Sequence, residues 1–223
     1  MSDSYSPVDL IVEHGTVLTM DPGLPKVEDG AVAISNGRIA GVGPAVEFAE
    51  QPAVRRIDAG GGIVMPGLVN CHTHAAMTCF RGIADDLPLE TWLNEHIFPA
   101  EAELDADAVY WGALLACAEM IRSGTTCFCD MYLFEESVAR AAKRAGIRAV
   151  VGEVLYDFPS PNYGPIEQGF AYTREMADRW KDDPLVSVAV EPHSPYLCSP
   201  SLLEEAARLS AEAGILLVVH VAE

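Results

Sequence analysis

The sequence predicts an α/β fold in which a β-rich N-terminal region is followed by parallel strands that alternate with helices. From residue 9 to about residue 57, short strand patterns are separated by turn signals, and Asn36-Gly37 is typical of a tight hairpin turn. From residue 63 onward, short apolar runs alternate with segments whose apolar residues have helical spacing. This alternation is the pattern of consecutive βα units, which place their strands in one parallel sheet.

The predicted elements follow one another in regular order. Strands are expected at residues 63–69, 124–131, 147–155, 185–191 and 215–219. Helices are expected at residues 105–122, 134–145, 167–181 and 200–213, with a short helix inside the insertion 84–103. Gly146 and Gly214 end two of these helices, and Ser199 is a suitable N-cap. The first and last strand runs are almost wholly apolar, so we expect both to be buried strands.

The composition narrows the class of partner. The net charge of −19 argues against polyanionic partners such as nucleic acid or acidic membrane surfaces. The first residues lack the basic and apolar regions of a secretory signal, and no run reaches the roughly 18–20 apolar residues of a membrane span. The six cysteines are scattered, which favours buried free thiols over a disulfide framework. These features predict a cytoplasmic protein that acts on a small molecule.

Four of the six histidines lie at or just after the ends of predicted strands. His72 and His74 are two residues apart where the first strand ends, so both side chains face the same way. His193 follows the fourth strand, and His220 follows the last, with Glu223 three residues later. Imidazole nitrogens bind zinc at roughly 2.0–2.1 Å, and a nearby carboxylate can move the proton of a metal-activated water. Because barrel enzymes carry their catalytic groups at these strand ends, the pattern predicts a metal site there.

The segments VMPGLVNCHTH, PHSPYLCS and HVAE, in this order, resemble the amidohydrolase superfamily. More narrowly, they are similar to the branch of methylthioadenosine and S-adenosylhomocysteine deaminases and their chlorohydrolase relatives. The resemblance implies a (β/α)8 TIM-like barrel, of which residues 63–223 supply the first five βα units. It also implies that residues 1–62 form a small β-sandwich completed by C-terminal strands. We therefore expect this chain to be the N-terminal half of a longer protein, whose remainder carries three more strands, a histidine after the sixth and a metal-binding aspartate after the eighth.

The resemblance implies a role for each histidine at these strand ends. His72, His74 and His220 are the expected metal ligands, and Glu223 is the expected catalytic acid and base. Many members of the superfamily bind two metals bridged by a lysine of the fourth strand, but that strand here reads VSVAVEPHS and has no lysine. We therefore expect one divalent metal per chain, with Zn²⁺ favoured and Fe²⁺ or Mn²⁺ as alternatives. The expected reaction is attack of a metal-bound hydroxide on the amino-bearing ring carbon of a purine.

Two further residues are expected to bind the substrate. Glu101 matches the position that binds ribose hydroxyls in the resembled family, with a solvated surface carboxylate as the alternative. His193 is expected to contact the substrate, with a structural core histidine as the alternative. Residues 152–164, where some members carry arginines for a substrate carboxylate, have none here, although a neighbouring subunit of a homo-oligomer could supply one.

The residues therefore favour methylthioadenosine, 5′-deoxyadenosine or adenosine over S-adenosylhomocysteine as the substrate. Two other functions stay open at this point. One is a chlorohydrolase or deaminase that acts on triazines or guanine-type bases, in which Glu101 has no ribose to bind. The other is a non-catalytic metal-binding relative.

Overall fold

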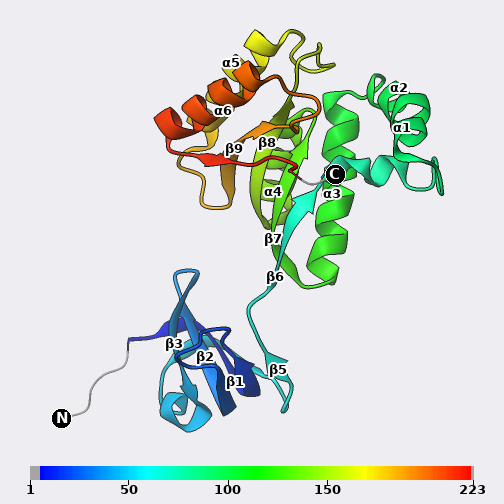
Figure 1. The fold of residues 1–223 in the computed structure, drawn as a ribbon. Coiled ribbons are helices and arrows are strands. Elements are labelled where there is room, and N and C mark those ends of the chain that lie inside the picture. The colour runs from blue at the N-terminus through cyan, green and yellow to red at the C-terminus, as the bar shows by residue number, and fades with distance from the viewer. Residues whose placement is uncertain (1–5, 222–223) are drawn as a thin grey trace. The chain divides into compact units, whose positions relative to one another are not determined.

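The computed structural model describes residues 6–221, and it divides between Pro66 and Gly67 into two compact units (Figure 1). The first unit holds the β-rich region, and the second holds the alternating strands and helices. In the part of the chain that is described, no helix is both long and apolar enough to cross a membrane.

The described residues of the first unit form one five-stranded mixed sheet. Its strands are β1 (Val8–Leu18), β2 (Lys26–Ser35), β3 (Arg38–Pro44), β4 (Ala53–Asp58) and β5 (Ile63–Val64). Strands β1, β2 and β3 pair antiparallel, whereas β4 and β5 both run parallel to β1. Asn36 and Gly37 join β2 to β3 with φ values of 51° and 71°, so the predicted hairpin turn is confirmed. A short 3-10 helix, Ala45–Phe48, follows β3.

The second unit is built on a parallel sheet whose strands stand in chain order, β6-β7-β8-β9-β10. The strands are β6 (Leu68–Thr73), β7 (Thr125–Tyr132), β8 (Arg148–Leu155), β9 (Val186–Pro192) and β10 (Leu216–Leu217). Parallel neighbours in strict chain order, each joined to the next by a helical crossover, form the start of a (β/α) barrel. The fold class expected from the sequence is thus confirmed for the described residues.

The helices between these strands are close to the predicted ranges. They are α3 (Ala106–Arg122), α4 (Glu135–Ala145), α5 (Ile166–Trp180) and α6 (Pro200–Ala213). Ser199 accepts a hydrogen bond from the backbone N–H of Leu202, and Gly146 and Gly214 end α4 and α6 with φ values of 77° and 65°. Positive φ favours glycine because it has no Cβ, so these two predicted helix ends have a physical cause.

The insertion between β6 and α3 contains short helical pieces joined by turns and irregular segments. It contains a 3-10 helix (Ala75–Phe80), α1 (Leu89–Thr91), a single π-helical turn (Trp92–Ile97) and α2 (Phe98–Glu101). Pairing in the sheet does not fix these segments, but they bring several side chains to the site described below.

Two strand predictions are wrong in detail. The run 63–69 is not one buried strand, because it divides at Pro66-Gly67 between β5 of the first sheet and β6 of the second. The run 215–219 is also not covered on both faces, because only Leu216 and Leu217 are in strand and both are exposed. Within the described residues, β6 and β10 are the two edges of the parallel sheet, so each has one strand neighbour there rather than two.

Candidate metal and substrate site

Three of the predicted residues come together at the C-terminal ends of the strands. His72 lies in β6, His74 follows that strand directly, and His220 follows β10. Their ligand nitrogens all lie within 4.8 Å of one another, which makes them a group that could hold a metal ion. The Nε2 atom of His72 is 3.3 Å from that of His74 and 3.1 Å from that of His220. Residues that are 148 positions apart in the sequence therefore form one cluster, which we call the histidine triad.

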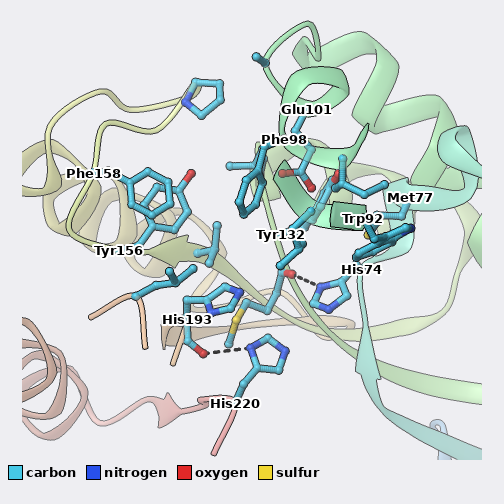
Figure 2. A pocket seen from close by; sticks show the side chains of 18 of the residues that line it. His74, Met77, Trp92, Phe98, Glu101, Tyr132, Tyr156, Phe158, His193 and His220 are labelled. Carbon is cyan, nitrogen blue, oxygen red and sulfur yellow. Dashed lines mark hydrogen bonds between the residues drawn. The ribbon is translucent and has the colours of Figure 1, made fainter. Parts of the chain in front are cut away.

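The backbone fixes which ring nitrogen faces the centre of the triad. His74 lies with Nδ1 2.6 Å from the carbonyl oxygen of Met131, and His220 with Nδ1 2.9 Å from the carbonyl oxygen of His193 (Figure 2). Donation from Nδ1–H to a carbonyl selects the tautomer in which Nε2 carries a free lone pair. Both rings therefore present Nε2 as a ligand atom.

The spacing of the triad fits a small divalent ion. Nitrogen ligands at 2.0–2.1 Å around a tetrahedral ion stand roughly 3.3–3.4 Å apart, close to the two Nε2–Nε2 distances of 3.3 and 3.1 Å. Three imidazoles without a thiolate or carboxylate suit Zn²⁺ and leave at least one coordination position for another ligand. The residues present therefore fit the metal that the sequence predicted.

His193 lies beside the triad but outside it. It follows β9 directly, and its ring centroid is 4.9 Å from that of His220. Its Nδ1 is 2.9 Å from the hydroxyl oxygen of Ser194, and its backbone oxygen accepts both the N–H and the Nδ1–H of His220. His193 therefore supports a triad ring through its main chain, while its own half-buried ring faces the pocket (Figure 2).

A pocket of about 450 Å³ opens directly above the triad. Its walls are mainly apolar and aromatic, and they come from the insertion on one side and from the loop after β8 on the other (Figure 2). On the loop side, the rings of Tyr156 and Phe158 stack with centroids 3.9 Å apart at 12°. Planar, apolar walls next to a few polar groups suit an aromatic ligand such as a nucleobase.

Glu101 is the acidic side chain in the lining of this pocket. It ends α2 and is half-buried, and burial raises the pKa of its carboxyl, while the nearby Tyr132 side chain opposes that rise. Burial, with the nearby charge of Glu101, raises the pKa of Tyr132 in turn. A carboxylate that is partly removed from water is stabilised by hydrogen bonds, so a ligand that donates hydroxyl groups to Glu101 would be favoured. This burial does not fit the alternative of a fully solvated surface carboxylate.

The remaining site prediction, Glu223, lies outside the described residues. Sequence reasoning also missed residues that the structure brings to the pocket. Tyr132 ends β7 and Tyr156 follows β8, so the strand-end rule that found the histidines could have found both. Phe158, Pro159 and Pro161 lie in an irregular loop, and no periodicity in the sequence marks them as pocket residues.

Comparison of the sequence with known proteins identifies the family to which the chain is similar. Residues 63–223 match the model of the Amidohydrolase family. A protein named 5-methylthioadenosine/S-adenosylhomocysteine deaminase, from Syntrophobacter fumaroxidans, is 61% identical over 219 residues, which are 98% of this chain and 50% of that protein. A protein named 5′-deoxyadenosine deaminase, from Methanococcoides burtonii, is 43% identical over 217 residues, which are 96% of this chain and 49% of that protein.

A solved structure is also similar to this chain in both fold and sequence. The crystal structure of an adenosine deaminase from Xanthomonas campestris with bound zinc has a TM-score of 0.92 and 40% sequence identity, over 97% of this chain and 50% of that chain. The present chain therefore spans about half the length of the relatives that it matches.

Proposed function

The chain belongs to the amidohydrolase family, and from this premise we propose that the full-length protein is a metal-dependent aminohydrolase of adenosine-like nucleosides. The observation that carries the proposal is the histidine triad at the floor of a mainly apolar pocket that has a half-buried carboxylate in its wall. The names of the relatives, which are deaminases of methylthioadenosine, S-adenosylhomocysteine and 5′-deoxyadenosine, support the same class of reaction.

We assign the metal to His72, His74 and His220, with Zn²⁺ as the favoured ion because a 40% identical structure contains zinc. When bound, such an ion lowers the pKa of a coordinated water to near ~7 and so supplies a nucleophile at neutral pH. We propose one ion per chain, because β9 reads VSVAVEP and offers no lysine that could bridge a second ion.

Glu223 is the proposed proton carrier. It would accept a proton from the attacking water and return it to the leaving amino nitrogen, so that ammonia departs as a neutral molecule. Its position three residues after His220 in the sequence supports this assignment. His193, which faces the same pocket, is proposed to hydrogen-bond the purine ring.

Glu101 is the proposed ribose ligand. A carboxylate can accept hydrogen bonds from both hydroxyls of a vicinal diol, and Glu101 lines the pocket from α2. A free base has no diol, so a base-specific enzyme would gain nothing from burying this charge. We therefore favour nucleosides over triazines and guanine-type bases.

The charged residues in the pocket lining bear on which nucleosides are the better substrates. The described residues that line it include no lysine or arginine, so they offer no counter-ion to an amino-acid carboxylate. The Tyr156–Phe158 stack and the neighbouring prolines present an apolar surface instead. We therefore propose that methylthioadenosine, 5′-deoxyadenosine and adenosine are better substrates than S-adenosylhomocysteine.

The test is release of ammonia, or of chloride from the triazine, by the full-length, metal-loaded protein on a matched panel. The panel contains methylthioadenosine, 5′-deoxyadenosine, adenosine, S-adenosylhomocysteine, adenine, guanine and a chlorotriazine. We expect the highest kcat/KM on the first three and lower values on the free bases. Faster turnover of guanine or the triazine would overturn the nucleoside assignment, and a metal-loaded protein that turns over none of the seven would overturn the proposed enzyme activity.

A further inference from the structure

The segment that carries two of the triad histidines is not held by a regular sheet ladder. Strand β6 pairs with β7 at Asn70–Phe128 and then at Thr73–Asp130, so three steps along β6 correspond to two along β7. The extra residue is a β-bulge immediately before the metal-binding turn. Bulges redirect side chains and interrupt ladder hydrogen bonds, so other contacts must hold His72 and His74 in place.

Those contacts come from two adjacent residues of β7. The Oδ1 atom of Asp130 lies 2.5 Å from the hydroxyl oxygen of Thr73 and accepts the backbone N–H of Ala75 at 2.6 Å. The next residue, Met131, faces Nδ1 of His74 with its carbonyl oxygen at 2.6 Å. Three consecutive residues of the turn are thus fastened to two consecutive residues of the strand.

The carboxylate of Asp130 is suited to this work because it is fully buried. Its side chain has no exposed surface, and no ion pair of the described residues involves it. Water does not reach this carboxyl group, so solvent does not compete with the two donors of the turn. The hydroxyl of Thr73 also lies 2.7 Å from the carbonyl oxygen of Cys129, so both of its acceptors belong to β7.

We propose that Thr73 and Asp130 form a clamp that positions His72 and His74 for metal binding. Neither side chain is a metal ligand; both act through the backbone on either side of His74. The inference rests on the metal site of the proposed function, and it adds that much of the affinity of this site comes from a pair that does not touch the metal. Outer partners of this kind typically change metal affinity by about 10- to 100-fold.

The test measures zinc affinity, not turnover, by chelator competition with the full-length protein. Thr73→Val keeps the shape of the side chain and removes the hydroxyl, so it should weaken zinc binding about 10- to 100-fold. Thr73→Ser keeps a hydroxyl at this position, so its zinc affinity should stay close to that of the original protein and should not show the loss expected for Thr73→Val. Thr173→Val is the matched control, because the hydroxyl of Thr173 donates to the backbone oxygen of Gly169 in α5, away from the triad. The control should leave zinc affinity unchanged.

The visible spectrum of a cobalt-substituted sample provides a second, independent measurement. The visible spectrum of bound Co²⁺ reports ligand geometry, so Thr73→Val should shift it while Thr73→Ser and Thr173→Val should not. Equal zinc affinity in Thr73→Val and the original protein would overturn the clamp, as would an equal loss in Thr73→Ser. Thr73→Ala repeats the comparison if Thr73→Val does not fold. Absence of metal binding by the original protein would instead overturn the proposed function, so the two failures can be told apart.

Discussion

The floor of the pocket and its walls are built by different means. The floor consists of His72, His74 and His220, which lie in or soon after strands. The rings of His74 and His220 are held by hydrogen bonds to backbone carbonyls at the strand ends of the same sheet. The walls come from the short helices of residues 89–101 and from the irregular loop after β8. A parallel sheet fixes the positions of its strand ends, whereas loops can vary without loss of the sheet. Under the proposed function, the metal chemistry therefore belongs to the scaffold and the choice of substrate to the walls.

The largest effect should come from the floor. His220→Ala removes one of the three ligands, so we expect loss of bound metal and turnover at the background rate. Elemental analysis and ammonia release on the purified protein provide the measurement. His14→Ala is the control, since His14 is an exposed histidine of the first unit that bonds Asp29, and it should change neither quantity. Full metal occupancy in His220→Ala would remove this residue from the site.

The next effect concerns proton transfer. Glu223→Gln keeps the size of the side chain and removes its basicity. A general acid–base residue contributes about 10²–10⁴-fold, so kcat should fall by at least about 10²-fold while the metal remains. The measurement combines steady-state kinetics with metal content. Loss of the metal would make Glu223 a ligand, and near-normal turnover would assign the proton transfer to another group.

A smaller and more selective effect should come from the wall. Glu101→Ala removes the proposed ribose contact, and hydrogen bonds to charged groups contribute roughly 1.5–3 kcal/mol, so kcat/KM on nucleosides should fall by about 10- to 150-fold. Metal content should be unchanged. The exposed Glu103 lies outside the pocket lining, so Glu103→Ala is the matched control. Equal losses of kcat/KM on adenosine and adenine would show that Glu101 does not bind the ribose.

The last and smallest effect concerns stability, and it should come from a residue that supports the wall from behind. Glu153 is buried, it accepts a hydrogen bond from the side-chain amide of Asn162 in the loop after β8, and burial raises its pKa from 4.5 to about 7. The folded state therefore binds a proton more tightly than the unfolded state does. The stabilisation from this proton is complete below about pH 4.5 and is lost as the pH rises through about 7, with a slope of up to about 1.4 kcal/mol per pH unit.

Glu153→Gln cannot titrate, so its free energy of unfolding should depend less on pH across this window than that of the original protein. Denaturant unfolding at a series of pH values measures the two slopes. Identical slopes would show that Glu153 titrates alike in the folded and unfolded states.

The difference between the floor and the walls also explains which features of the fold and the site could be predicted from the sequence. The βα order, the hairpin at Asn36-Gly37 and the helix ends at Gly146 and Gly214 were all predictable, because local spacing and backbone conformation decide them. The convergence of His72, His74 and His220 was predictable for a related reason: parallel strands end at one edge of their sheet. The division of residues 63–69 between two sheets was not, because it depends on which strands become neighbours.

The pocket walls were the least predictable part of the site. The π-helical turn at Trp92–Ile97 and the stacking of Tyr156 on Phe158 depend on tertiary packing, which no local pattern encodes. The Thr73–Asp130 clamp joins residues 57 positions apart through a bulge, and a bulge has no reliable sequence signal. The proposed ligands could therefore be predicted from the sequence, while the contacts that hold their side chains in place could not.

Metal titration tests the central claim most directly. The full-length protein is stripped of metal, and zinc is added in steps while ammonia release from methylthioadenosine is followed. The account predicts no turnover without metal, a linear rise as zinc is added, and a plateau at one equivalent per chain. Full turnover by the metal-free protein, or a plateau that requires two equivalents, would contradict it.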